Sequence, residues 1–130
     1  MFIPDNNQKY TALIVDDNFH NRHIFRIALE AVGYTVDESE DGLMGIERLN
    51  RECFHLLILD LHMPKMDGQQ VLRTLRKDPR HTQMQVVVVT ANAHMATDDV
   101  SELADFIMVK PIDVVQFAEL AKRLRGMHVA

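Results

Sequence analysis

Short hydrophobic runs recur along the chain, and each is followed by a stretch with helical spacing. Residues 12–15, 56–59 and 86–89 are continuous runs rich in branched side chains, which is typical of strands buried on both faces of a parallel sheet. Residues 34–37 alternate between hydrophobic and polar, as an edge strand does, and residues 106–109 form a shorter run. The pattern predicts five strands.

Hydrophobic residues at helical spacing fill the intervals between these runs. Gly33 follows the first of these intervals, and glycine commonly ends a helix at such a position. Asp67 can cap the start of a further helix, which ends before Pro79. The other expected helices cover residues 18–32, 43–51, 94–103 and 114–125. Helices thus alternate with strands along the whole chain.

Five strand–helix pairs predict an α/β domain with a five-stranded parallel sheet and helices on both faces. Right-handed crossovers leave few arrangements, and the alternation alone does not fix the strand order. We predict a flavodoxin-like, doubly wound (βα)5 fold with the common order 2-1-3-4-5. The 130 residues, 47% of them hydrophobic, suit one domain, which we place at residues 11–125 between an N-terminal extension (1–10) and a C-terminal tail (126–130).

Charge and composition narrow the function classes. A net charge of −5 gives no electrostatic support to nucleic-acid binding. No hydrophobic stretch approaches the ~20 residues that span a bilayer, and the N-terminus lacks a signal-peptide pattern. The single cysteine, Cys53, excludes an intrachain disulfide. We therefore expect a cytoplasmic protein that binds neither membrane nor nucleic acid directly.

Polar residues follow four of the predicted strands. Asp16 and Asp17 follow the first run, Asp60 the third, Thr90 the fourth and Lys110 the fifth. In open α/β sheets, ligands bind in the crevice beyond the carboxyl ends of the strands. The order 2-1-3-4-5 brings the ends of the first and third strands together at that crevice.

Three carboxylates in one crevice require neutralisation. Two of them ~5 Å apart repel by roughly 3 kcal/mol at an effective dielectric of 20, so protons are shared or a cation binds. Oxygen ligands suit Mg²⁺, which often bridges to a phosphate. Lys110 supplies a compact charge and Thr90 a hydroxyl donor for phosphoryl oxygens. These groups together predict a phosphoryl-transfer site, although Asp17 alone also reads as a helix N-cap.

The motifs resemble the receiver domain of bacterial response regulators and hybrid histidine kinases, over about residues 11–124. The resemblance rests on Val15-Asp16-Asp17-Asn18, Asp60-Leu61-His62-Met63-Pro64-Lys65-Met66-Asp67-Gly68, Thr90-Ala91 and Lys110-Pro111. The segment around Asp60 is the most specific of these motifs. Asn21-Arg22 is similar to receivers of hybrid kinases in particular.

The resemblance implies a role for each site residue. Asp60 is expected to take a phosphoryl group as an aspartyl phosphate, and Lys110 to contact that group. Thr90 is expected to move towards the phosphate after transfer. The implied metal is Mg²⁺, and its implied ligands are Asp16, Asp17, Asp60 and the backbone carbonyl of His62.

The implied function is a phosphorylation-controlled switch with slow self-dephosphorylation, not a metabolic enzyme. The implied donor is a histidine kinase or a histidine phosphotransfer protein, and a phosphorylation-dependent homodimer also fits the family. The family commonly docks near the first helix, where His20, Arg22, His23 and Arg26 form a candidate contact surface. The family also implies a cis peptide bond before Pro111.

One position departs from the family pattern. The family usually has Tyr or Phe three residues before the conserved Lys, where this chain has Ile107. We expect the neighbouring Phe106 to belong to the core. The stretch from Thr90 to Lys110 is also short, which predicts a trimmed fourth helix. Phosphorylation is therefore expected, and the output mechanism stays open.

Two alternatives remain. A Mg²⁺-dependent phosphohydrolase usually has an acid two residues after the nucleophile, where this chain has His62, and turnover of a small phosphoester would support it. A degenerate receiver would bind partners without phosphorylation, and the intact set of polar residues argues against it. The sequence also leaves open whether the receiver stands alone or belongs to a longer protein.

Overall fold

Five strands alternate with five α-helices in the computed structural model, which describes residues 9–63 and 65–127. The strands are β1 (Tyr10–Val15), β2 (Tyr34–Ser39), β3 (Leu56–Asp60), β4 (Gln85–Thr90) and β5 (Phe106–Val109). The helices are α1 (Phe19–Ala31), α2 (Gly42–Arg51), α3 (Gly68–Arg76), α4 (Asp98–Leu103) and α5 (Val114–Gly126), with 3₁₀ turns at Pro79–His81 and Ala93–Met95. The rest of the predicted extension and tail, residues 1–8 and 128–130, lies outside the described residues, as does Pro64.

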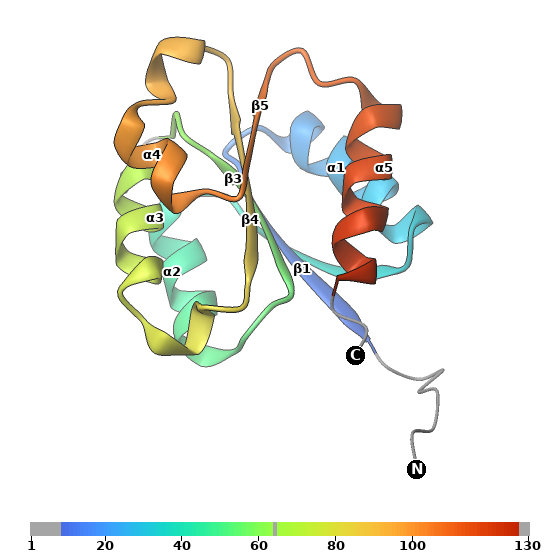
Figure 1. The fold of residues 1–130 in the computed structure, drawn as a ribbon, viewed down its shortest axis with the longest axis horizontal. Coiled ribbons are helices and arrows are strands. Elements are labelled where there is room, and N and C mark those ends of the chain that lie inside the picture. Colours follow the sequence, from blue (N-terminus) through green and yellow to red (C-terminus); the bar gives the residue numbers. More distant parts are fainter. Residues whose placement is uncertain (1–8, 64, 128–130) are drawn as a thin grey trace.

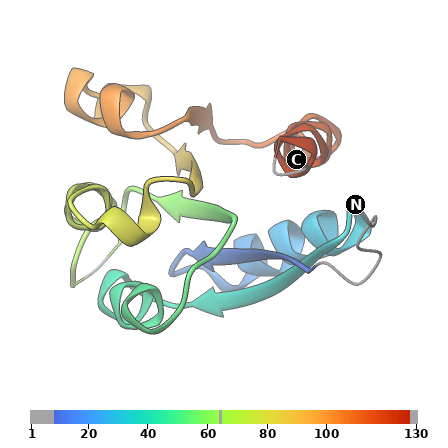
Figure 2. The same ribbon diagram turned by 60° about the horizontal axis from the view of Figure 1, so that its bottom comes forward.

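The sheet is parallel throughout, and its strand order is β2-β1-β3-β4-β5. Helices α1 and α5 cover one face, and α2, α3 and α4 cover the other (Figure 1). Figure 2 shows this order across the sheet, from teal β2 at one edge to orange β5 at the other. The predicted flavodoxin-like fold and strand order are confirmed. Among residues 9–63 and 65–127, no helix is long and hydrophobic enough to span a bilayer.

Two hydrophobic clusters hold the layers together, one on each face of the sheet. Ile14 faces α1 and α5, where the rings of Phe25 and Phe117 lie 4.9 Å apart. Leu13, the preceding residue, faces the other side and belongs to the cluster that contains Leu72. Because successive strand side chains point to opposite faces, a strand covered on both sides needs a continuous hydrophobic run.

Capping side chains set where the helices begin. Asn18, Asp41 and Asp67 each accept a hydrogen bond from a backbone N–H in the first turn of α1, α2 and α3. The predicted cap at Asp67 is therefore confirmed. The alternative interpretation of Asp17 as the cap of α1 is wrong, because Asn18 takes that position. Gly33 has a φ of +99° just after α1, which confirms the predicted helix end.

The region before β5 differs from the sequence-based prediction. The expected helix over residues 94–103 is divided into a 3₁₀ turn and the six-residue α4, because Thr97 caps a new helix there. The expectation of a trimmed fourth helix is confirmed. Phe106 does not belong to the core: its side chain is 39% exposed, because β5 is an edge strand with one neighbour. Ile107 is half-buried and packs on the α4 side.

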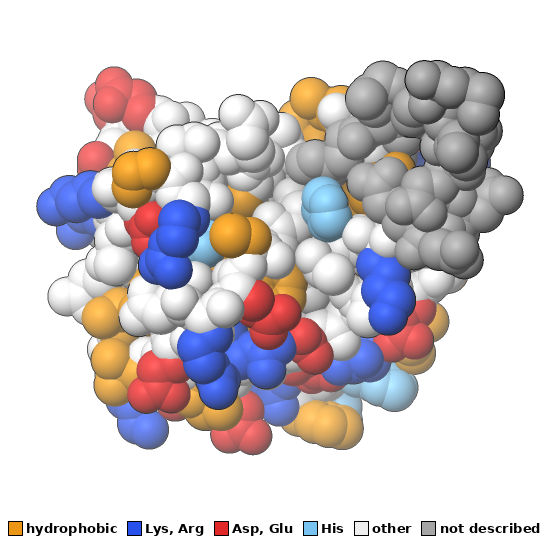
Figure 3. All heavy atoms as spheres, turned by 90° about the horizontal axis from the view of Figure 1, so that it is seen from below, with side chains coloured by type: hydrophobic (Ala, Val, Ile, Leu, Met, Phe, Trp, Pro, Cys, Tyr) orange, Lys and Arg blue, Asp and Glu red, His pale blue; other side chains and the backbone are white. Residues whose placement is uncertain are grey.

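Acidic and basic side chains lie interspersed on the face at the amino ends of the strands (Figure 3). Before β5, the Asp105 carboxylate pairs with Arg76 at 2.9 Å and accepts the N–H of Val86 at 2.7 Å. Arg76 also donates to the carbonyl of Leu103 at 2.8 Å. These polar contacts join the ends of α3 and α4 to the amino ends of β4 and β5.

Candidate functional site

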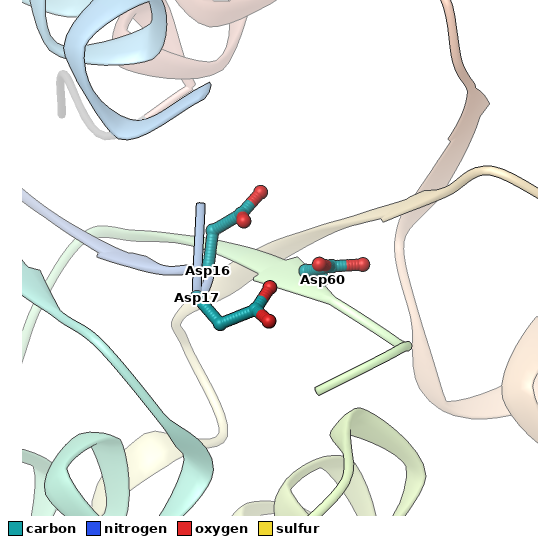
Figure 4. Close-up of side chains that lie close together, drawn as sticks. All are labelled: Asp16, Asp17 and Asp60. Atoms are coloured by element: carbon teal, nitrogen blue, oxygen red, sulfur yellow. The ribbon is translucent and has the colours of Figure 1, made fainter. Parts of the chain in front are cut away.

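Three carboxylates lie together at the carboxyl ends of β1 and β3 (Figure 4). Asp16 and Asp17 directly follow β1, and Asp60 is the last residue of β3. One oxygen from each carboxylate lies within 4.8 Å of the others. β1 and β3 are neighbours in the sheet, but the strand after β1 lies on one side of this pair and the strand after β3 lies on the other. The ends of β1 and β3 therefore flank the point where the strand order reverses, which is where open α/β sheets bind ligands. The predicted grouping is found in the structure.

Two of these carboxylates are buried. The exposed fractions are 1% for Asp16 and 4% for Asp60, whereas Asp17 is exposed. One oxygen of Asp16 accepts the N–H of Asn18 at 2.8 Å, and one oxygen of Asp60 accepts the N–H of His62 at 3.1 Å. The second Asp16 oxygen, Oδ2, is buried and has no hydrogen-bond donor among the described residues. Leaving such an oxygen without a partner is costly, so the crevice favours a cation.

Among the described residues, Lys110 is the cation that pairs with carboxylates of the cluster. Its Nζ lies 3.6 Å from Asp16 Oδ2 and 3.7 Å from Asp60 Oδ2. The peptide bond between Lys110 and Pro111 is cis, as the resemblance implied. One ammonium cannot neutralise three carboxylates, so the crevice keeps a negative charge.

This environment makes Asp60 a weaker acid than usual. Burial is the main cause that raises the pKa of Asp60 from 3.8 to about 6, and the charge of Asp16 acts in the same direction. The N–H of His62 and the ammonium of Lys110 act in the opposite direction. Folding without a bound cation therefore costs free energy at neutral pH, where Asp60 must ionise.

We expect Asp60→Asn to stabilise the metal-free protein at neutral pH. Folded Asp60 keeps its proton up to about pH 6, whereas the unfolded chain loses it near pH 3.8, so the wild type loses stability as the pH rises between these values. The variant should unfold with a free energy about 2 kcal/mol higher at pH 7.5, and the difference should shrink towards pH 4. Urea denaturation of both proteins in the presence of a chelator, at pH 7.5 and at pH 4, measures the difference in unfolding free energy and its pH dependence. Exposed Asp17→Asn should change stability less, and a gain independent of pH would contradict the raised pKa.

Thr90 is fully buried at the end of β4, and its hydroxyl is engaged with its own loop. The hydroxyl donates to the carbonyl of Asn92 at 3.0 Å and accepts the N–H of Asn92 at 3.1 Å. Asn92 in turn accepts the N–H of His94 with its side chain at 2.9 Å. Thr90 therefore fixes the start of the loop that leads to α4. Ala91, the small residue after Thr90, is exposed.

Close backbone contacts hold the segment after Asp60, and the sequence-based prediction did not assign them. A Cβ at Gly68 would lie 2.3 Å from the carbonyl oxygen of Asp60, and one at Gly42 would lie 2.0 Å from the carbonyl oxygen of Met66. In the segment from Asp60 to Gly68, Lys65 adopts a φ of +62°. The sequence signal available for the contact at Gly42 is the Asp41-Gly42 pair, which is typical of a turn and does not reveal the close approach.

The predicted basic contact surface on α1 is only partly found. His20 and His23 are exposed. Arg22 is buried, with 7% of its surface exposed, so its assignment to a docking surface is wrong. Its guanidinium turns inward to Glu38, a partner 16 residues away that helical spacing does not reveal. Arg26 pairs with the same carboxylate.

Hydrophobic side chains are also exposed on α1. Phe19 is 64% exposed on α1, and Ile24 is 44% exposed. A groove beside Ile24 is lined by Lys110 and Pro111 and leads to Val114 at the start of α5. The groove therefore begins at the residue whose ammonium faces the carboxylates.

One family profile, that of the response regulator receiver domain, matches residues 12–124. The sensor protein EvgS of Escherichia coli K12 is 36% identical over 86 residues, which are 66% of this chain and 7% of that protein. The probable transcriptional regulator ycf27 of Porphyridium aerugineum is 33% identical over 123 residues, which are 92% of this chain and 48% of that protein. The chain thus spans at most about half the length of these relatives.

Solved structures share the fold closely. A response regulator receiver domain from Methylobacillus flagellatus superposes with a TM-score of 0.82 at 24% identity, covering 90% of this chain and 99% of that one. The response regulator protein TrrA of Thermotoga maritima, solved in complex with Mg²⁺ and BeF, gives a TM-score of 0.80 at 29% identity, covering 88% and 98%.

Proposed function

The chain belongs to the family of response regulator receiver domains of two-component signalling, and from this premise we propose that Asp60 is its phosphoacceptor. The observation that carries the proposal is the convergence of Asp16, Asp17 and Asp60 on one crevice, with the ammonium of Lys110 beside it. Such a site suits a group that arrives with negative charge and a metal ion.

The residues present fit a Mg²⁺ ion. Three carboxylate oxygens lie within 4.8 Å of one another, and the buried Oδ2 of Asp16 has no hydrogen-bond donor among the described residues. We propose that Asp16, Asp17, Asp60 and the backbone carbonyl of His62 hold the ion. When bound, it would neutralise charge on the carboxylates and on the phosphoryl oxygens.

The geometry around Asp60 suits nucleophilic attack on a phosphohistidine. The N–H of His62 holds Oδ1, so Oδ2, which faces Lys110 at 3.7 Å, is the oxygen we assign to attack. A new bond forms from Oδ2 to phosphorus while the bond from phosphorus to the imidazole nitrogen breaks, and its electron pair stays on the donor histidine. Lys110 would stabilise the charge on the phosphoryl oxygens, and burial of Asp60 would limit access of water to the product.

We propose that Thr90 transmits the change. Its hydroxyl would exchange its two bonds to Asn92 for one to a phosphoryl oxygen, which would release the start of the loop before α4. Ile107 lies half-buried on the α4 side, so the output does not use an aromatic ring at this position. Rearrangement of the loop itself is the route we expect.

We propose a histidine kinase or histidine phosphotransfer protein as the donor. The groove between α1 and α5 begins at Lys110 and Pro111, and exposed Ile24 and Val114 form part of its hydrophobic lining. A donor helix seated there would bring its phosphohistidine to the crevice. The names of relatives, among them a sensor protein and a hybrid signal transduction histidine kinase of Dictyostelium discoideum, agree with such a donor. A cytoplasmic location and a phosphorylation-dependent homodimer are further parts of the proposal.

Acetyl phosphate provides the direct test. With Mg²⁺ present, we expect the intact protein to gain the mass of one phosphoryl group, and with a chelator in place of Mg²⁺ we expect no gain. The added group should be lost slowly on removal of acetyl phosphate. Steady turnover of a small phosphoester would support the phosphohydrolase alternative instead, and failure to gain mass would support a degenerate receiver.

A further inference from the structure

Arg22 is a buried cation that binds the backbone of the acidic crevice. It lies in the first turns of α1, and 7% of its surface is exposed. Its Nη1 donates to the backbone carbonyl of Asp16 at 2.8 Å, and its Nε donates to a carboxylate oxygen of Glu38 at 3.0 Å. One planar guanidinium thus joins the end of β1 to β2 through α1.

The carbonyl of Asp16 belongs to the peptide bond that links Asp16 to Asp17. The preceding N–H of Asp16 already continues the pairing with β2, since it donates to the carbonyl of Ser39 at 3.3 Å. Arg22 therefore fixes the next peptide plane, which sets the direction in which two of the three carboxylates leave the backbone (Figure 4). Asn18 completes this arrangement, because its N–H donates to the Asp16 carboxylate at 2.8 Å.

Glu38 holds the guanidinium in this position. It lies on β2, opposite Ile14 of β1, and its second oxygen accepts from Arg26. The rigid fork of arginine matches a carboxylate and a carbonyl at the same time, which a lysine ammonium does less well. The contact of Arg22 with the Asp16 carbonyl distinguishes it from Arg26, whose hydrogen-bond partners among the described residues are Glu38 and Glu30.

We propose that Arg22 is a positioning residue for the Mg²⁺ site: it acts through the Asp16–Asp17 peptide and contacts neither the ion nor the phosphoryl group. The expected effect of Arg22 on Mg²⁺ affinity rests on the proposed function. The expected effect of Arg22 on the Asp16–Asp17 backbone rests on the geometry alone. Groups that orient metal ligands typically change metal affinity 10–100-fold when they are removed.

The test compares Arg22→Met with Arg26→Met, two substitutions that each remove one arginine from Glu38. We expect the Mg²⁺ dissociation constant, measured by calorimetric titration, to rise about tenfold or more in Arg22→Met and to stay within about twofold in Arg26→Met. Without metal, hydrogen exchange at the N–H of Asn18 should accelerate about tenfold in Arg22→Met alone. Arg22→Lys keeps the charge but not the fork, and should raise the dissociation constant by a smaller factor.

Each outcome decides the question. If both methionine variants lose thermal stability equally and leave Mg²⁺ affinity and exchange unchanged, Arg22 is only a structural ion pair and the proposal is wrong. If Arg22→Met does not fold, unchanged affinity and exchange in Arg22→Lys would overturn it equally. A wild-type protein that binds no Mg²⁺ would contradict the proposed function, while the exchange comparison would still decide the role of Arg22.

Discussion

Asp60→Asn is expected to take up no phosphoryl group from acetyl phosphate under conditions in which the wild type gains one. The side-chain amide has no anionic oxygen to attack phosphorus, so the loss should be complete rather than partial. The amide oxygen can still accept the N–H of His62, which lies 3.1 Å from Asp60 Oδ1 in the wild type, so the local backbone should be retained. Intact-mass measurement with Mg²⁺ present reads the result directly.

The same substitution is expected to raise stability, which separates lost chemistry from lost folding. Removing a carboxylate whose pKa burial raises to about 6 removes the cost of burying its charge at pH 7.5, and also its repulsion with Asp16. A matched control is Asp78→Asn in the loop before β4, where the carboxylate pairs with Arg80 at 2.6 Å. That variant should take up phosphoryl normally. Continued uptake by Asp60→Asn would show that another residue is the acceptor.

Much of the site was predictable because the chemistry lies at strand ends. A continuous hydrophobic run marks β1 and β3, and the first polar residues after such runs must emerge at the carboxyl edge of the sheet. Asp16 and Asp60 follow this rule, so their proximity required only the strand order. Thr90 and Lys110 follow it at the ends of β4 and β5. The hydrophobic pattern and the strand order together were therefore sufficient to predict that these four residues lie at the carboxyl edge of the sheet.

The residues that support the site were not predictable in the same way. Arg22 looks like a surface residue from helical spacing, because its carbonyl partner directly follows β1 and its carboxylate partner lies on β2. Phe106 looks like a core residue from its type, but β5 has a neighbour on one side only and leaves the ring 39% exposed. The division of the fourth helix depends on Thr97 acting as a cap, which competes with a continuous helical pattern. The errors at Arg22 and Phe106 concern tertiary packing that the local pattern does not specify, whereas the error in the fourth helix concerns a local cap.

Gly68→Ala is expected to lower the free energy of unfolding by about 2 kcal/mol. An added Cβ would lie 2.3 Å from the carbonyl oxygen of Asp60 and 2.6 Å from the Cα of Leu61, both of them backbone atoms that cannot rotate away. Overpacking of this kind typically costs up to about 3 kcal/mol. Alanine gains back at most about 1 kcal/mol over glycine in a helix, so the collision prevails. Urea denaturation measures the difference.

Gly126→Ala provides the matched control, because an added Cβ there meets nothing within 4 Å at the end of α5. It should leave stability unchanged or raise it by up to about 1 kcal/mol. The backbone atoms that Gly68 approaches belong to Asp60 and the residue after it, so α3 can accept the methyl group only by moving away from the nucleophile. Phosphoryl uptake should therefore fall in Gly68→Ala even where the protein remains folded. Equal stability and equal uptake in the two variants would show that this approach of α3 to β3 is not what holds Asp60 in place.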